Sequence, residues 1–438
     1  MKPINVGLLG VGTVGGGTFI VLKRNKEEIA RRAGREIVVK MIADRDLDKA
    51  RLLASGEVVV TDDAYEIVTN PDIDIVVELI GGSTIAKELI LKAIENGKHV
   101  VTANKALLAL HGTEIFAAAR KKGVVVAFEA AIAGGIPIIK ALREGLTANR
   151  IEWIAGIING TANFILSEMR EKGLPFATAL EQAQKLGYAE ADPTFDIEGI
   201  DAAHKITIMA AIAFGIPVQF DKIYSEGIAQ LTSEDIRYAE ELGYRIKLLG
   251  ITKRVSKGIE LRVHPTLIPA QQLISNVEGV MNAVVVKGDA VGVTLYYGPG
   301  AGAEPTASSV IADLVDVTRV QTADPKHRVP SLSFQPDLLS STPIIPMEEV
   351  ETSYYLRLRA VDKPGVLADI SRILANSEIS INAMVQKEPS KGEDKVDIII
   401  LTHITVEKNM NAAIASIEEL SVVEGKVIRI RLEELNHN

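Results

Sequence analysis

The sequence predicts a protein of the α/β class with three domains: a doubly wound parallel sheet, an α+β domain and a small βαββαβ module. Three observations lead to this prediction. Short strands rich in Val and Ile alternate with helices through residues 1–130, helices and then strands cluster in 131–303, and a βαββαβ pattern fills 353–433. The stretch between, 321–352, holds five prolines and is expected to be an extended linker.

The composition excludes several classes of function. The 438-residue chain is 47% apolar, and no run of about 18 uncharged apolar residues predicts a membrane span. Its start leads directly into a strand pattern without a signal sequence, so we expect a cytoplasmic protein. The net charge of −9, without a basic stripe, argues against a nucleic-acid partner. The absence of cysteine excludes disulfides, zinc–thiolate sites and a thioacyl mechanism.

The first domain carries a nucleotide-binding signal. Gly10, Gly12, Thr13, Val14 and Gly15 belong to a G-x-G-x-x-G motif between a strand and a helix, which is typical of Rossmann-type folds. The first glycine permits a tight turn, the second lets the backbone approach a pyrophosphate, and the third lets helix and strand pack closely. A glycine-rich turn without a ligand is the alternative. Five further strands are expected at IVVKMIAD, EVVVTD, IDIVVELIG, KHVVTANK and VVVAFEA.

The second strand of this domain, IVVKMIAD, ends at Asp44 and Arg45. An acid at this position favours NAD by accepting from the ribose 2′-hydroxyl, whereas an adjacent arginine favours NADP by binding the 2′-phosphate. Arg45 and Lys105 are both expected to face a phosphate, so the sequence favours NADP, with NAD as the alternative. A surface arginine without a ligand role is the other interpretation of Arg45.

The middle region predicts a substrate-binding and dimerisation domain. Its helices are expected at IPIIKALREGL, ANFILSEMREKG, FATALEQAQKLG and 199–214, and its strands at RIKLLGITKRV, IELRVHPTLI, NAVVVKGD and VGVTLYYG. A further helix at 304–320 is expected to return and pack on the first domain. The C-terminal βαββαβ pattern predicts a ferredoxin-like module.

The helix at 199–214 combines a charged start with an apolar body. Asp201 and Lys205 are four residues apart and share a helix face, whereas the rest of the helix is apolar nearly all round and is expected to be buried. A buried ion pair is seldom a net stabiliser, so a functional role is favoured over an ordinary surface pair. Lys205 would donate a proton to a developing alkoxide, and the carboxylate would keep it charged and oriented. His204 lies on another face and is expected to be a packing residue.

Five motifs together resemble homoserine dehydrogenases. They are the glycine motif GVGTVGGG, TANK (102–105), EAAIAGGIPII (129–139), NGTANFIL (159–166) and GYAEADPTFDIEGIDAAHK (187–205). The resemblance extends to about residue 320. The segment DKPGVLADISRILANSEISINAM resembles an ACT domain, the amino-acid-sensing module appended to this family. No aspartate kinase domain precedes it, so the chain looks like the monofunctional form.

The resemblance implies reversible reduction of L-aspartate 4-semialdehyde to L-homoserine, in threonine, methionine and isoleucine biosynthesis. It implies that Lys205 is the proton donor or acceptor at the substrate oxygen, that Glu190 and Asp201 bind homoserine, and that the Gly187 backbone lies beside cofactor or substrate. Lys105 is expected where cofactor and substrate meet, at the carboxyl end of a sheet strand. Which of the two lysines dominates the proton transfer stays open.

The resemblance also implies a monovalent cation site, usually occupied by sodium. Its ligands would be Glu129 and the carbonyl groups of Ile132, Gly134 and Ile136. The residues alone predict only a glycine-rich turn, because any residue offers a carbonyl oxygen. Gly302, in GPGAGAEPT, matches a second backbone contact to the cofactor.

In the C-terminal module a loop ending at Gly365 precedes a helix, and Asn382 is expected after the next strand. Modules of this kind bind amino acids between paired copies. We therefore expect an amino-acid effector, threonine above all, near Gly365 and Asn382, in a homodimer or homotetramer. A purely structural dimerisation module is the alternative.

Two other functions compete with this interpretation. One is a different Rossmann-type oxidoreductase that acts at the Cα amine of an amino acid. The other is an amino-acid sensor that keeps the fold without catalysis. The combination of Lys105, Glu190, Asp201 and Lys205 argues against the sensor.

Overall fold

The computed structural model describes residues 2–56, 58–387 and 394–435. Its contacts divide the chain into two compact units, each assembled from separated segments. The first unit comprises Met1–Gly160, Asp201–Ile223 and Val280–Thr342, and the second comprises Thr161–Ile200, Tyr224–Gly279 and Pro343–Asn438.

The first unit contains the predicted doubly wound parallel sheet. Its six strands have the order β3-β2-β1-β4-β5-β6, and all neighbouring pairs are parallel. The strands are β1 (Ile4–Leu9), β2 (Ile37–Ala43), β3 (Val59–Thr61), β4 (Ile75–Glu78), β5 (His99–Thr102) and β6 (Val126–Ala127). All six coincide with predicted strands. The order reverses between β1 and β4, and ligands of such sheets bind at the carboxyl ends of the strands beside this switch point.

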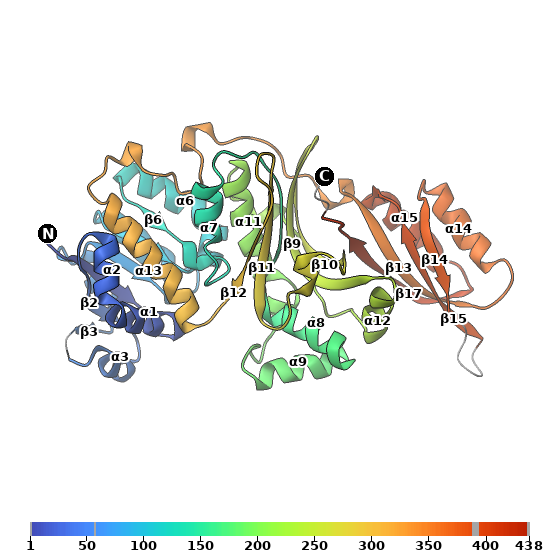
Figure 1. Ribbon diagram of the computed structural model, residues 1–438, viewed down its shortest axis with the longest axis horizontal. Helices are drawn as coiled ribbons and strands as arrows, with labels where there is room; N and C mark the ends of the chain where they lie inside the picture. Colours follow the sequence, from blue (N-terminus) through green and yellow to red (C-terminus); the bar gives the residue numbers. More distant parts are fainter. Residues whose placement is uncertain (1, 57, 388–393, 436–438) are drawn as a thin grey trace. The chain divides into compact units, whose positions relative to one another are not determined.

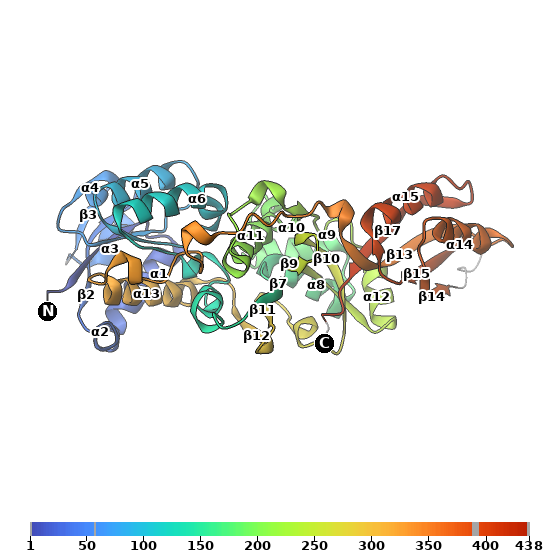
Figure 2. The same ribbon diagram turned by 90° about the horizontal axis from the view of Figure 1, so that it is seen from above.

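Helices cover both faces of this sheet (Figure 2). One face carries α4 (Ala64–Thr69), α5 (Ile85–Glu95) and α6 (Lys105–Lys122), and the other carries α1 (Thr13–Arg24), α2 (Lys26–Ala33) and α13 (Ala303–Val320). The short α3 (Leu47–Ala54) connects β2 to β3. Strand side chains therefore enter two cores: Val6 and Leu8 pack with residues of α1 and α13, and Leu9 and Val76 pack with residues of α5 and α6. This double burial explains why the strands are apolar without alternation.

Helix α13 returns to the parallel sheet from a distant part of the sequence. A Cβ atom on Gly17 of α1 would lie 2.5 Å from the carbonyl oxygen of Ala303, so only glycine permits this approach. Arg24 pairs with Glu304 at 2.8 Å beside this contact. The start of α13 is thus held against the helix that follows the glycine motif.

The first unit also contains a three-stranded antiparallel arrangement, β12-β11-β7, and the buried helix α11 (Ile200–Phe214). The strands are β7 (Ile151–Ile157), β11 (Met281–Gly288) and β12 (Gly292–Pro299). Strand β7 was not predicted from the sequence, because its apolar run lies between two predicted helices. The helix predicted at IPIIKALREGL is present: α7 (Ile138–Lys140) continues directly as a π-helical turn (Ala141–Gly145).

The second unit is built around a long antiparallel hairpin, β9 (Tyr244–Val255) and β10 (Gly258–Pro269), with the short β8 (Tyr224–Ser225) parallel to β10. Four helices accompany it: α8 (Gly160–Lys172), α9 (Phe176–Lys185), α10 (Thr194–Ile197) and α12 (Ser233–Glu241). A capping box at Thr232 and Asp235 begins α12.

The C-terminal part of the second unit has the predicted βαββαβ order (Figure 1). Its elements are β13 (Glu351–Val361), α14 (Val366–Asn376), β14 (Ile381–Gln386), β15 (Lys395–Thr402), α15 (Glu407–Glu418) and β17 (Val423–Leu432), with a short β16 (Thr405–Val406). The strand order is β17-β13-β15-β14, and α14 and α15 share one core with the strands. Strand β17 also pairs in parallel with β10 at Thr266 and Leu267, so the sheet continues into the hairpin.

The proline-rich stretch forms no long element. It contains 3₁₀ turns at Pro325–His327, Pro336–Leu338 and Met347–Glu349, and Ile344 forms an isolated β-bridge with Ile259. Within the described ranges, no helix is both long and apolar enough to cross a membrane.

Candidate active site

The three motif glycines occupy three different environments. Gly10 has φ +92°, which side chains disfavour, and a Cβ there would lie 2.9 Å from the carbonyl oxygen of Leu79. A Cβ on Gly15 would lie 2.0 Å from the carbonyl oxygen of Gly10, so this glycine lets α1 pack against the turn. A Cβ on Gly12 would meet nothing within 4 Å. The open side of the loop is therefore at Gly12, next to the first-turn N–H groups of Thr13 and Val14, which suits an anion.

Asp44 fixes this loop at the end of β2. Its Oδ2 accepts a hydrogen bond from the Val11 N–H at 2.6 Å, and its Oδ1 accepts one from the Asp46 N–H at 2.8 Å. Both carboxylate oxygens thus hold backbone in place. The adjacent Arg45 is exposed, and the hydrogen bonds and ion pairs of the described chain do not involve it.

A buried polar network holds the ends of β4 and β5. Glu78 accepts hydrogen bonds from the N–H groups of Ile80 and Gly81, both at 3.0 Å, and from the Thr102 hydroxyl at 2.7 Å. The side chain of Asn104 accepts from the Leu107 N–H at 3.1 Å and so caps α6. Lys105 is the first residue of that helix, at the carboxyl end of the sheet.

Asp201 lies between two lysines. Its Oδ2 is 2.6 Å from Nζ of Lys205, one turn later on α11, and its Oδ1 is 3.0 Å from Nζ of Lys105. Lys205 Nζ also donates to the Ile158 carbonyl oxygen at 2.7 Å, and Asn159 Nδ2 donates to Asp201 Oδ2 at 2.9 Å. The predicted pair of Asp201 and Lys205 is therefore present, and Lys105 joins it.

This cluster is buried to different degrees. The side chains of Asp201 and Lys205 are 6% and 10% exposed, whereas that of Lys105 is 33% exposed. Burial alone would raise the pKa of Asp201, but the charges of Lys205 and Lys105, with hydrogen bonds from Lys205 and Asn159, lower this pKa well below its usual value. The carboxylate is therefore ionised at neutral pH and provides a fixed negative charge.

His204 packs as the sequence predicts. Its ring lies 4.3 Å from the ring of Phe220, centroid to centroid. Burial lowers the pKa of His204 to about 4, although the charge of Asp201 opposes this shift. The ring is neutral at physiological pH, which suits a packing role.

Glu129 begins a buried turn after β6. Its two carboxylate oxygens accept hydrogen bonds from the N–H groups of Ile139 and Lys140, at 2.8 and 2.9 Å, and its own N–H donates to Asp313 at 2.7 Å. Burial and the charge of Asp313 raise the pKa of Glu129 to about 8. This is a buried carboxylate whose nearest polar partners are mainly N–H groups.

The three carbonyl groups of the expected cation site lie in the same turn. The Gly134 carbonyl accepts from the Ser309 hydroxyl at 2.6 Å, and the Ile136 carbonyl accepts from the Ile138 N–H at 2.8 Å. Ile132 is fully buried. One carboxylate and three carbonyl groups are the oxygen ligands that a hard cation takes. The described residues contain no cluster of three or more His, Cys, Asp or Glu that could hold a metal ion.

Gly302 is the N-cap of α13, with φ +119°. It precedes Ala303, which contacts Gly17 on the helix of the glycine motif. Gly302 therefore lies one residue before the close approach of α13 to α1.

Four predicted site residues belong to the second unit. Gly187 (φ +76°) and Glu190 lie in an exposed loop between α9 and α10. Gly365 is the left-handed N-cap of α14. Asn382 is exposed and lies within β14, at a register shift between Ile381 and Ala383, rather than after the strand as expected. A bulge explains this, because the extra residue turns out of the ladder.

Three residues around the candidate site were not assigned roles from the sequence: Ile158, Asn159 and Glu78. Asn159 and the Ile158 carbonyl follow β7, the strand that the sequence analysis missed. Glu78 was visible as one acid at the end of an apolar strand, which is an unusual position for a charge. An acid in this position predicts a buried hydrogen-bond network, but it does not predict which residues take part.

Family models and curated relatives both match this chain to homoserine dehydrogenases, and the relatives match over its whole length. Residues 10–129 match the model described as homoserine dehydrogenase, NAD binding domain, residues 137–315 match the model of homoserine dehydrogenase, and residues 354–422 match that of the ACT domain. The homoserine dehydrogenase of Pseudomonas aeruginosa is 64% identical and that of Neisseria gonorrhoeae is 61% identical, each over 436 residues covering 100% of both chains.

Similar solved structures also include homoserine dehydrogenases. A homoserine dehydrogenase from Thiobacillus denitrificans is 71% identical, with a TM-score of 0.96, and the match covers 100% of this chain and 99% of that one. A hyperthermophilic archaeal homoserine dehydrogenase in complex with NADPH is 27% identical, with a TM-score of 0.62, covering 72% of this chain and 98% of that one.

Proposed function

The chain belongs to the homoserine dehydrogenase family and is thus an oxidoreductase, and we propose that it interconverts L-homoserine and L-aspartate 4-semialdehyde with NADP. The observation that best supports this chemistry is the buried Lys205, whose ammonium group is held by Asp201 and the Ile158 carbonyl in the unit that carries the glycine loop. A positioned proton donor of this kind is what carbonyl reduction requires.

The proton has a defined route in this proposal. When bound, the nicotinamide supplies or accepts the hydride at the substrate carbon. In the direction of reduction, Lys205 gives one proton from its ammonium group to the carbonyl oxygen, which becomes the hydroxyl of homoserine. In oxidation the neutral amine takes that proton back. After each turnover, Lys205 must therefore exchange a proton with solvent or with a neighbouring base.

Lys105 is suited to that exchange, because it shares the Asp201 carboxylate and is more exposed than Lys205. Asp201 pairs with both ammonium groups and so holds them on one carboxylate. We propose that Lys205 acts at the substrate oxygen and that Lys105 shares the proton work. Asp201 also contributes to homoserine binding in this scheme, together with Glu190 and the Gly187 backbone. The carboxylate of Glu190 suits the α-ammonium group of homoserine.

The preference for NADP rests on Arg45. This exposed arginine follows Asp44, whose two oxygens are already bound by the N–H groups of Val11 and Asp46. A ribose 2′-phosphate would therefore meet a cation there. The hyperthermophilic archaeal relative in complex with NADPH supports the same choice. The loop from Gly10 to Gly15 would hold the pyrophosphate, and Gly302 would contact the cofactor through its backbone.

We also propose a structural monovalent cation, sodium in the first place, at Glu129. The carboxylate and the carbonyl groups of Ile132, Gly134 and Ile136 would hold it. Burial and Asp313 raise the pKa of Glu129 to about 8, and a bound cation would favour its ionised form. Its part would be to stabilise the turn between β6 and α7.

Regulation would come from the ACT domain. We propose that an amino acid of the threonine, methionine and isoleucine pathway, threonine above all, binds near Gly365 and Asn382 between paired chains and inhibits the enzyme. The proposed assembly is a cytoplasmic homodimer or homotetramer. Equal turnover with and without saturating threonine, methionine, lysine or isoleucine would remove the inhibitory role.

The decisive experiment is a rate assay of the purified chain with L-homoserine and either NADP or NAD. We expect formation of the reduced cofactor with both, and a higher kcat/KM with NADP. A screen of other amino acids in the same assay is the specificity control. Turnover of an amino acid at its Cα amine, without turnover of homoserine, would contradict the proposal.

A further inference from the structure

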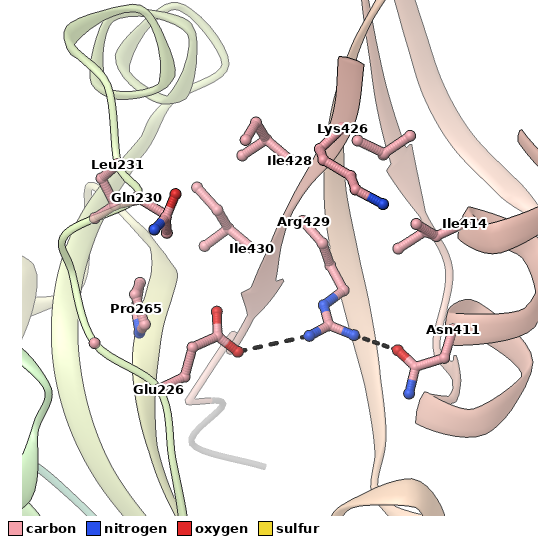
Figure 3. A pocket seen from close by; sticks show the side chains of 12 residues that line it. Glu226, Gln230, Leu231, Pro265, Asn411, Ile414, Lys426, Ile428, Arg429 and Ile430 are labelled. Atoms are coloured by element: carbon pink, nitrogen blue, oxygen red, sulfur yellow. Dashed lines mark hydrogen bonds and ion pairs between the residues drawn. The ribbon is translucent and has the colours of Figure 1, made fainter. Parts of the chain in front are cut away.

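A cavity of about 360 Å³ lies within the second unit, between α15, β17 and the loop of residues 226–231 (Figure 3). Small-molecule sites have volumes of about 300–1,000 Å³, so a ligand of a few heavy atoms would fit. None of the residues assigned above to catalysis, cofactor or effector binding lines it. Much of its wall is apolar and consists of Leu231, Pro265, Ile414, Val427, Ile428 and Ile430.

A cationic edge faces this cavity from β17. Arg429 Nη1 lies 2.8 Å from Glu407 Oε1 and donates to Asn411 Oδ1. Its Nη2 lies 3.5 Å from Glu226 Oε2, which exceeds the usual N–H···O distance of about 2.7–3.2 Å. A guanidinium has five N–H donors in a fixed plane. Nη2 therefore retains capacity to bind a carboxylate, the anion that arginine binds best in this geometry.

Lys426 adds a second cation at the rim. Its side chain is 84% exposed and pairs with Glu418 at 2.6 Å. Exposed pairs of this kind contribute little, because water screens the charges and the side chains lose entropy. Lys426 can therefore exchange Glu418 for the carboxylate of a ligand at small cost.

An anionic group faces the same cavity from the opposite wall. Oε2 of Glu226 accepts from the Tyr224 hydroxyl at 2.6 Å and from Arg431 Nη1 at 2.8 Å. Within the described chain, the side-chain contacts of Glu226 all use this oxygen. Figure 3 shows the second oxygen, Oε1, turned away from Arg429. This oxygen can accept a hydrogen bond from a ligand ammonium group.

These observations together specify the charge of the ligand. A simple anion would meet the carboxylate of Glu226, and a simple amine would meet Arg429 and Lys426. A zwitterion pairs with both sides, and the apolar wall is left for a side chain. We propose that this cavity binds a free α-amino acid with an apolar side chain. Its carboxylate pairs with Arg429 and Lys426, and its ammonium group pairs with Oε1 of Glu226.

The test uses the full-length chain and L-isoleucine in isothermal titration calorimetry. Two analogues each lack one charge: 3-methylpentanoate has no ammonium group and 2-methylbutylamine has no carboxylate. We expect L-isoleucine to bind and each analogue to bind at least about tenfold more weakly. Hydrogen exchange should show slower exchange in β17 and α15 upon binding. Absence of heat, or equal binding of an analogue, overturns the proposal.

Variants then locate the site. Arg429 also pairs with the buried Glu407, so its replacement would disturb the fold, and exposed lining residues are better targets. Lys426→Glu should weaken binding at least tenfold, and Gln230→Trp should abolish it by filling the cavity. Lys408→Glu, on the exposed side of α15, introduces the same charge change outside the cavity and should leave the affinity unchanged.

Asn382→Ala separates this cavity from the effector position in the ACT domain. If L-isoleucine binds in the cavity, Asn382→Ala keeps its affinity. Binding that survives both Lys426→Glu and Gln230→Trp, or that is lost only in Asn382→Ala, overturns the proposal. Neither outcome bears on catalysis, because the homoserine assay with wild-type protein tests that separately.

Discussion

Nζ of Lys105 lies 3.0 Å from Oδ1 of Asp201, so a residue at the end of a parallel strand meets the start of a buried helix that follows much later in the sequence. The other oxygen of the same carboxylate binds Lys205 at 2.6 Å. Two ammonium groups thus share one counter-charge. Because the three residues share one ion-pair network, the free-energy effects of mutating them should not be additive.

Replacement of Lys205 tests the proton donor. We expect Lys205→Ala to lower kcat for homoserine oxidation by about 10²- to 10⁴-fold, the usual contribution of a general acid or base. The affinity for NADPH, measured by fluorescence titration, should change little. Retention of more than half of the wild-type activity would exclude Lys205 as the donor.

Lys105→Ala is the matched comparison, because it removes the other partner of the same carboxylate. We expect a smaller loss of kcat, about tenfold, since Lys205 keeps its contacts with Asp201 and Ile158. The double variant should be little worse than Lys205→Ala alone. A larger loss in Lys105→Ala than in Lys205→Ala would reverse the assignment.

Asp201→Asn removes the shared counter-charge while it keeps the shape. Two buried or half-buried ammonium groups would then face each other without compensation, which favours loss of a proton. We expect a higher KM for homoserine and a lower kcat. In the direction of semialdehyde reduction, which requires the ammonium form of Lys205, activity should be lost at lower pH than in wild type as the pH rises. An unchanged KM would contradict a role of Asp201 in substrate binding.

The motif glycines permit a paired test of the nucleotide loop. Gly15→Ala places a Cβ 2.0 Å from the Gly10 carbonyl oxygen, so we expect a loss of about 1–3 kcal/mol in unfolding free energy. Gly12→Ala meets no atom within 4 Å, so stability should stay near wild type while NADPH binds about tenfold more weakly. Thermal unfolding and fluorescence titration measure the two effects. Equal NADPH affinity in Gly12→Ala and wild type would place the pyrophosphate elsewhere.

The sequence alone predicts the regular parts of this protein well. The six parallel strands, the βαββαβ module and the pair of Asp201 and Lys205 follow from local periodicity and spacing, and the structure contains all of them. Contacts between distant segments were beyond such reasoning. The approach of Lys105 to Asp201 depends on how α6 and α11 pack, and the hydrogen bond from Lys205 to Ile158 depends on β7, whose pattern was missed.

Cofactor preference is tested at Arg45. This side chain is exposed next to Asp44, so its replacement should not affect folding. We expect Arg45→Ala to raise the Kd of NADPH about tenfold and to leave that of NADH nearly unchanged, because only NADPH carries the 2′-phosphate. Arg35 precedes β2, and Arg35→Ala serves as the control for the loss of one positive charge. Equal changes for both cofactors would show that Arg45 does not read the 2′-phosphate.

His99 supplies a prediction for stability against pH. Its Nδ1 accepts a hydrogen bond from the Val125 N–H at 2.9 Å, so the ring must be unprotonated on that side. Burial, assisted by the charge of Arg328, lowers the pKa of His99 from its ordinary 6.5 to about 4. Between these two values the unfolded chain binds a proton that the folded chain does not. Stability therefore rises with pH across this window and is lost as pH falls from 6.5 toward 4.

His99→Gln removes this proton uptake and keeps a side-chain acceptor for the Val125 N–H. We expect the unfolding free energy to fall more in wild type than in the variant between pH 7 and pH 5. The difference should be about 2 kcal/mol, because one proton binds to His99 in the unfolded wild-type chain. Thermal unfolding of both proteins across this range measures the difference, with the exposed His403→Gln as the control. Parallel curves for wild type and His99→Gln would mean that His99 is protonated in the folded state, and that the Val125 hydrogen bond is not formed in solution.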